Sequence, residues 1–148
     1  MKIFADNPKA YFNYDISDKY EAGIVLIGQE VKSIRNGRVN LTGSYVVITG
    51  EEAYLVGASI PPYQPKNAPK DYDSQRSRKL LLERSEISRL IGVTKEKGNA
   101  LIPLKLFAKG VKIKLEFGIG TGKKKTDKRQ TIKKRETDRE IERELKKR

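Results

Sequence analysis

The chain has 148 residues, with 32 lysines and arginines against 19 aspartates and glutamates, and therefore a formal net charge of +13. It contains no histidine and no cysteine, which excludes disulfides, thiolate zinc sites, and catalysis by a cysteine nucleophile or a histidine base. The length suits one domain with a short appendage, and the positive charge indicates a polyanionic partner, most commonly nucleic acid.

The N-terminal third of the chain predicts a strand followed by a short helix. Residues 11–17 alternate between two sets of side chains with the two-residue period of a strand. Residues 29–36 predict a helix, because Val31 and Ile34 lie three positions apart and Gly37 follows as a natural C-terminal glycine.

The middle of the chain predicts a hairpin and then a long loop. Residues 44–49 and 53–60 read as two strands joined by a glycine-containing turn. The stretch from Ile60 to Arg78 is polar, rich in proline and without periodicity. Loops of this length inside a small domain are usually functional or mobile.

A second helix and a second hairpin follow. Residues 85–97 carry an apolar helical stripe, with Ser85 as the expected N-cap and Gly98 as the expected end. Residues 100–107 and 111–119 predict a hairpin, in which Pro103 indicates an edge or a bulge. The apolar face of its second strand is expected to hold Val111, Ile113, Leu115 and Phe117.

These elements predict a mostly β fold: a small OB-like closed antiparallel barrel with two or three short helices. The composition changes near Gly122. Residues 1–122 hold 19 basic and 13 acidic side chains, whereas residues 123–148 hold 13 and 6. We therefore expect a barrel over 1–122 and a basic tail over 123–148.

The tail has too few large apolar residues to offset its ordering entropy, which predicts disorder when it is alone. Pairs such as Glu136–Arg139 and Glu140–Arg143 have the spacing of neighbours on a helix surface. We therefore expect the tail to become helical when a partner neutralises its charge. The glycine–lysine run that leads into it lacks the spacing of a phosphate-binding loop.

The sequence disfavours a membrane as the anionic partner. Its longest apolar runs, 23–28 and 45–49, are far shorter than the roughly 20 residues of a spanning helix. No long apolar stretch with a cleavage site occurs at the N-terminal end, and we expect a cytoplasmic protein.

Aromatic and cationic residues are mixed near the N-terminal end, where they could stack on unpaired bases and bind phosphates, or simply belong to the core. They are Asn7, Lys9, Tyr11, Phe12, Tyr14, Lys19 and Tyr20. Glu21 and Glu30 raise the alternative of a magnesium site, but no dense carboxylate cluster surrounds them. In so basic a chain, a single glutamate more often orients an arginine or accepts from a base, and the sequence therefore predicts no metal site, cofactor or catalytic residue.

Ordered motifs along nearly the whole chain resemble the small protein B family of SsrA-binding proteins. They include YEAGI at 20–24, GQEVKSIR at 28–35, DSQRSRKLLL at 73–82 and GKKKTDKR at 122–129. The resemblance implies an OB-like barrel that binds the tRNA-like domain of transfer-messenger RNA. It also implies delivery of this RNA, with elongation factor Tu bound through the RNA, to stalled bacterial 70S ribosomes for trans-translation. The tail would sense the empty message channel of the ribosome, and the protein would act as a monomer.

The resemblance also implies which residues would act. The RNA-binding set is Asn7, Glu21, Gly23, Glu30, Lys32, Ser33, Arg35, Asn40, Arg76, Arg78, Leu81 and Lys114. The tail set at the ribosomal decoding centre is Gly122, Lys123, Lys124, Asp127, Lys128 and Arg129. The chain departs from the family pattern at Thr126, where a histidine or tyrosine is usual, and one expected stacking contact would be weakened.

Two other functions fit the same composition. A general ribosomal or translational RNA-binding module would bind assorted RNAs without preference. A carboxylate-metal RNA-processing enzyme would cleave RNA with Mg²⁺, and Glu21→Gln or Glu30→Gln would abolish that cleavage. The ordered motifs together with the tail favour the rescue factor.

Overall fold

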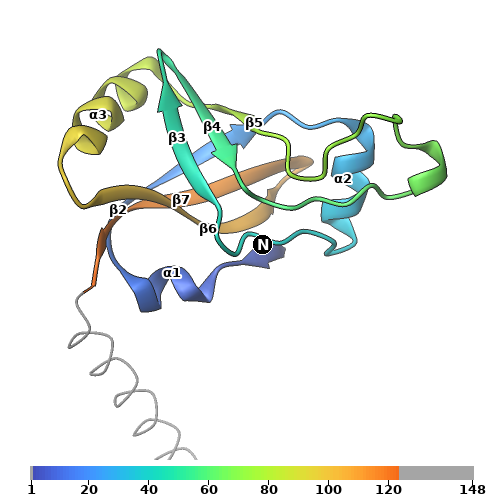
Figure 1. The fold of residues 1–148 in the computed structure, drawn as a ribbon, viewed down its shortest axis with the longest axis horizontal. Helices are drawn as coiled ribbons and strands as arrows, with labels where there is room; N and C mark the ends of the chain where they lie inside the picture. The colour runs from blue at the N-terminus through green and yellow to red at the C-terminus, as the bar shows by residue number, and fades with distance from the viewer. Residues whose placement is uncertain (1, 124–148) are drawn as a thin grey trace, which may run out of the picture.

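The computed structural model describes residues 2–123, which form seven strands and three α-helices (Figure 1). The predicted mostly β fold with short helices is confirmed. In chain order the elements are β1 (Ile3–Asp6), α1 (Pro8–Asn13), β2 (Tyr14–Ile24), α2 (Gly28–Arg35), β3 (Tyr45–Thr49), β4 (Glu52–Val56), a 3-10 turn (Pro65–Asn67), β5 (Arg78–Leu81), α3 (Arg84–Lys95), β6 (Asn99–Lys109) and β7 (Lys112–Gly122).

The strands pair antiparallel in a circuit that returns to its starting point. Around this circuit the order is β6–β3–β4–β5–β2–β7, and β7 pairs again with β6. The short strand β1 lies outside the circuit and pairs with β6. A sheet closed in this way leaves few unpaired edges, as the barrel prediction requires.

The inward faces of the strands form the core, together with one side of α2 and α3. Its largest fully buried apolar side chains are Ile34, Leu41, Leu55, Ile60, Leu80, Leu90, Leu101, Leu106, Phe107, Leu115 and Phe117. A smaller cluster forms beneath α1, where Ala10 packs on Ile102 and Leu104.

The first predicted strand is wrong over its initial residues, because Pro8–Asn13 is a helix and β2 begins only at Tyr14. Pro8 occupies the first turn, where a missing N–H costs nothing. Only Ala10 of this helix is buried. A six-residue helix with a single buried side chain leaves no periodic pattern that could be distinguished from alternation.

Both predicted hairpins are confirmed, as β3–β4 and β6–β7. The strand expected to reach Ile60 ends at Val56. The expectation for Val111 was wrong: it lies in the β6–β7 turn and is 87% exposed, while Ile113, two residues on, is buried. At Pro103 the register between β6 and β7 shifts, so the proline marks a bulge and not an edge.

The third helix begins earlier than predicted. It spans Arg84–Lys95, with Glu83 and not Ser85 at the N-cap. The Glu83 backbone N–H donates to Glu86 Oε1 at 3.0 Å, which satisfies one of the free donors at the helix start. None of the helices within residues 2–123 combines the length and the apolar character needed to cross a membrane.

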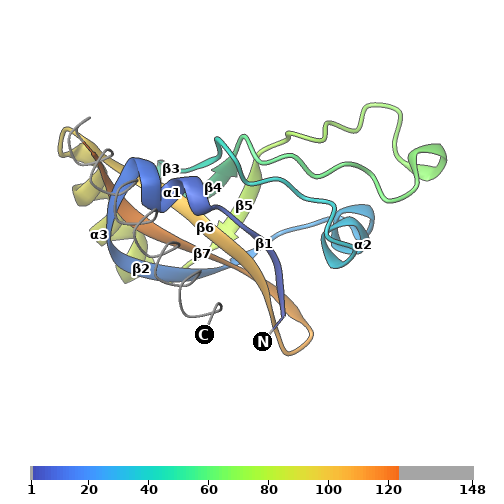
Figure 2. The same cartoon turned by 90° about the horizontal axis from the view of Figure 1, so that it is seen from below.

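The helices α2 and α3 lie at opposite sides of the sheet (Figure 1). The predicted long loop joins β4 to β5 and extends past α2, away from the strands (Figure 2). The predicted tail spans residues 123–148, of which 124–148 lie outside the described residues.

Candidate nucleic-acid interface

A groove of about 320 Å³ lies where β2, β5, α2 and the β6–β7 turn meet. Four of the predicted RNA-binding residues line it together: Gly23, Arg35, Leu81 and Lys114. They come from four separate elements and are far apart in the sequence. Their convergence on one depression is the strongest support that the structure gives to the predicted set.

Three of these residues form a row across neighbouring strands. Gly23 on β2 pairs with Leu81 on β5 and with Lys114 on β7. A Cβ atom on Gly23 would lie 3.3 Å from Leu81 Cβ and 3.4 Å from its Cδ1. The glycine therefore leaves room for Leu81, which stays 56% exposed beside the groove.

The fourth residue ties α2 to the sheet. Arg35 Nη2 donates to the Val111 carbonyl oxygen at 2.9 Å. The β6–β7 turn thereby brings Val111 and Lys112 into the groove wall, and neither residue belongs to the set predicted from the sequence. Exposed apolar side chains among three cations suit an unstacked RNA segment, because the cations meet phosphates and the apolar groups meet bases.

A buried ion cluster is centred on Glu30 of α2, the helix that also supplies Val31 and Arg35 to the groove. The carboxylate is fully buried and pairs with two arginines. Arg78 donates to Glu30 Oε2 through Nε at 2.9 Å and Nη2 at 2.6 Å. Arg76 donates to the same carboxylate through Nε at 3.1 Å and also through Nη2.

The cluster anchors the end of the long loop. Arg78, itself fully buried, also donates to the carbonyl oxygens of Ala58 at 2.9 Å and Ser74 at 3.0 Å. The Tyr72 hydroxyl donates to the Ile60 carbonyl oxygen at 2.6 Å and lies 3.2 Å from Glu30 Oε2. These contacts hold the loop ends against α2 and leave Arg76 partly exposed, with 33% of its side-chain surface accessible.

The environment of Glu30 stabilises its ionised form. Burial alone would raise the pKa of this carboxyl, but hydrogen bonds from Arg76, the Ile27 backbone N–H and Arg78 outweigh it and lower the pKa below the ordinary value of 4.5. A carboxylate with a lowered folded-state pKa stabilises the fold above its unfolded-state pKa, and this contribution is lost as the pH falls through the folded-state value.

We therefore expect the stability difference between the wild type and Glu30→Gln to be largest near neutral pH. It should shrink as the pH falls below 4.5, since protonation removes the charge that the substitution also removes. Urea unfolding of both proteins over a pH series measures this difference. A constant difference down to strongly acidic pH would contradict the assignment of the lowered pKa to Glu30.

The remaining residues of the predicted RNA-binding set differ in accessibility. Glu21, Lys32 and Asn40 are exposed. Glu21 accepts from Lys109 Nζ at 3.0 Å, and the Lys32 ammonium lies 5.8 Å from the centre of the Tyr63 ring. Asn40 Oδ1 accepts from the Thr42 backbone N–H at 2.9 Å.

Ser33 is fully buried and donates to the Arg38 carbonyl oxygen at 3.0 Å. Three residues of the predicted set are therefore fully buried and support the interface without reaching the surface: Glu30, Ser33 and Arg78. Within residues 2–123, no three acidic side chains lie close enough together to hold a metal ion.

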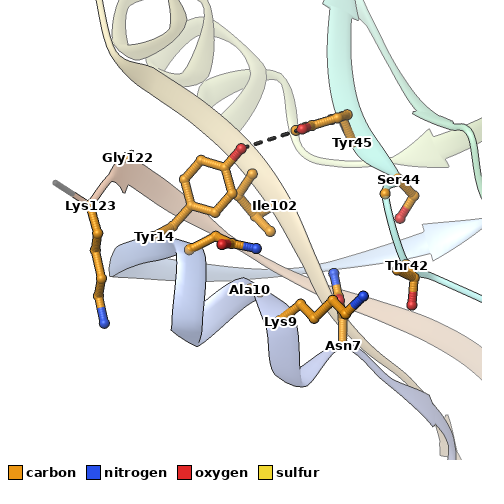
Figure 3. A pocket seen from close by; sticks show the side chains of 12 residues that line it. Asn7, Lys9, Ala10, Tyr14, Thr42, Ser44, Tyr45, Ile102, Gly122 and Lys123 are labelled. Carbon is orange, nitrogen blue, oxygen red and sulfur yellow. Dashed lines mark hydrogen bonds between the residues drawn. The ribbon is translucent and has the colours of Figure 1, made fainter. Parts of the chain in front are cut away.

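Asn7, Gly122 and Lys123 lie away from the groove, around a second pocket beside α1 (Figure 3). Along β7 this pocket is at the opposite end from Lys114. The other tail residues of the predicted set, from Lys124 to Arg129, are outside the described residues.

The closed antiparallel sheet and its cation-lined groove define a small nucleic-acid-binding β protein. The family model described as "SmpB protein" matches residues 4–147. An SsrA-binding protein of Geobacillus kaustophilus is 51% identical over 96% of this chain and 91% of its own length. Another, from Magnetococcus marinus, is 52% identical over 99% of this chain and 97% of its own length.

The fold has a solved counterpart in the same family. A structure described as "tmRNA-SmpB: a journey to the center of the bacterial ribosome" superposes with a TM-score of 0.68 and 41% identity, covering 82% of this chain and 85% of the other. The chain belongs to the SmpB family. The resemblance that the sequence motifs carried is thereby confirmed, and the family is one of RNA-binding proteins and not of enzymes.

Proposed function

We propose that the protein binds the tRNA-like domain of transfer-messenger (SsrA) RNA and delivers it to stalled bacterial ribosomes, without catalysis of its own. The observation that carries this proposal is the groove in which Gly23, Arg35, Leu81 and Lys114 converge. Supporting it, the relatives are named SsrA-binding proteins, and the solved counterpart is described as tmRNA with SmpB at the bacterial ribosome.

The groove suits a folded RNA loop better than a plain duplex. Lys114, Lys112 and Arg35 would bind phosphates, while Leu81 and Val111 would pack on unstacked bases. Arg76, held by Glu30 at the edge of the long loop, would extend the cationic surface. Glu21 and Asn40 would accept hydrogen bonds from base amino or ribose hydroxyl groups.

The proposal assigns separate roles to the two parts of the chain. The barrel over 1–122 would bind the RNA, and the basic tail over 123–148 would enter the empty message channel. Elongation factor Tu would be reached through the RNA. The protein would work as a cytoplasmic monomer.

Deletion of residues 124–148 tests this division. We expect the shortened protein to keep its affinity for the tRNA-like domain within about three-fold, because the groove is intact and only non-specific phosphate attraction is lost. Tagging of stalled chains in a reconstituted translation system should be abolished. The measurements are a filter-binding titration and a peptide-tagging assay, and loss of RNA binding together with tagging would contradict the two-part arrangement.

A further inference from the structure

The second pocket lies at the base of the tail and has a volume of about 410 Å³. Its wall is formed by α1, the start of β2, residues 42–45, Ile102 and the end of β7 (Figure 3). Gly122 here lies eight positions along β7 from Lys114 in the groove. At about 3.3 Å per residue, the two sites are roughly 26 Å apart along the strand.

One buried polar atom in this wall has no partner. Asn7 is only 5% exposed, and its Nδ2 donates to the Pro103 carbonyl oxygen at 3.0 Å. Its Oδ1 has no hydrogen-bond partner among the described residues. A buried acceptor without a donor is costly, and Asn7 is one of the residues that line the pocket. Lys9, which is exposed and lies beside Asn7, can move to admit a ligand (Figure 3).

The rim of the pocket carries two tyrosines and two lysines. The Tyr14 and Tyr45 hydroxyl groups lie 3.3 Å apart across the pocket, and Tyr45 is 44% exposed. Lys9 and Lys123 line the same wall. Tyrosine rings can stack on a base and lysines can bind its phosphates. The same lysines disfavour an ammonium ligand, although such a group could also donate to Asn7.

We propose that this pocket receives one unpaired nucleobase that carries an exocyclic amino group: adenine, cytosine or guanine. The amino group donates to Asn7 Oδ1, the ring stacks on Tyr45, and Lys9 binds a flanking phosphate. The site is distinct from the groove, so the protein holds RNA at both ends of the β2–β7 ladder. Asn7 belongs to the RNA-binding set that the resemblance implies, and the inference gives it a specific ligand. It rests on the proposed function only in taking RNA as the partner.

A matched pair of probes isolates the amino group. Adenosine and purine riboside differ only in the exocyclic amine, and hexamers of each can be titrated against the full-length protein. We expect the adenosine hexamer to bind about five-fold more tightly, the contribution of one hydrogen bond to a buried acceptor. Asn7→Leu should abolish this preference, and equal affinity of the wild type for the two hexamers would overturn the proposal.

Two further variants place the base. Tyr45→Leu should weaken both hexamers equally, whereas Tyr63→Leu, beside Lys32 and outside the pocket, should leave both unchanged. Both side chains lie at the surface or only partly below it, so these variants keep the test valid if Asn7→Leu does not fold. Hexamer binding lost in Tyr63→Leu but kept in Tyr45→Leu would place the base near Tyr63 and overturn the pocket assignment.

The pocket proposal can be tested separately from the proposed function, because Tyr45→Leu should still bind the tRNA-like domain. The source of the base is found by cross-linking. The chain has no native cysteine, so Tyr45→Cys carries a single photoactivatable label. Cross-links to ribosomal RNA or to transfer-messenger RNA in stalled ribosomes would both support the pocket and would identify its RNA. Cross-links to protein alone would contradict it.

Discussion

Glu30→Gln is expected to lower the free energy of unfolding by about 3–5 kcal/mol, the cost of leaving a buried ion pair with one partner. Glu30 and Arg78 are both fully buried, and Arg78 donates to the same carboxylate oxygen through two nitrogens. Glutamine has nearly the same shape but supplies no charge. Arg78 would remain in the interior with its charge uncompensated. The expected loss is a large part of the roughly 5–15 kcal/mol that stabilises a typical domain.

The matched control is Glu52→Gln. Glu52 also pairs with a cation, Lys79, but both side chains are nearly half exposed, at 48% and 46%. Removing an exposed pair should change stability far less than removing the buried one, because solvent screens its attraction. Urea unfolding followed by circular dichroism measures both variants. Equal effects of the two substitutions would mean that the Glu30 cluster is not a stabilising element of the fold.

Lys114→Glu is expected to weaken binding of the tRNA-like domain by about ten-fold or more. The slope of log affinity against log salt concentration should fall by about one, because one phosphate contact is lost. The residue lies in the groove on β7, where it pairs with Gly23 of β2, and β2 separates it from Leu81 on β5. Reversing its charge removes one phosphate contact and adds repulsion. Stability should be nearly unchanged, since the side chain is only partly buried.

Lys95→Glu is the control for this prediction, because it changes the net charge by the same amount. Lys95 is exposed in the last turn of α3, on the other side of the sheet from α2 (Figure 1). We expect its effect on affinity to stay within about three-fold, the result of long-range attraction alone. If both variants lost affinity equally, the RNA would be held by net charge and not by the groove.

The sequence predicted the hairpins and α2 well because their signals are local. Turn glycines and a continuous apolar face define β3–β4 and β6–β7, and Val31, Ile34 and Gly37 define the helix. The helix α1 could not be predicted in this way. Its single buried side chain, Ala10, packs on residues about ninety positions later in the chain, and such tertiary contacts override a local pattern.

For the candidate site, too, the local sequence could not predict features that depend on tertiary contacts. Arg76 and Arg78 belong to one motif and look equivalent in the sequence. Only the structure shows that Arg78 is fully buried while Arg76 reaches the surface. The sequence predicts that a single glutamate orients an arginine, and Glu30 does this for both Arg76 and Arg78. It could not place Asn7 at the far end of the sheet, because strand register decides that position.

The central claim is that the groove recognises the shape of one RNA. The most direct test titrates the full-length protein with the tRNA-like domain of transfer-messenger RNA, with ordinary tRNA as competitor, at several salt concentrations. We expect a preference for the tRNA-like domain that persists as salt rises, because contacts to bases and ribose depend little on counterion release. Equal binding of both RNAs with the same steep salt dependence would contradict the account and would indicate simple phosphate attraction.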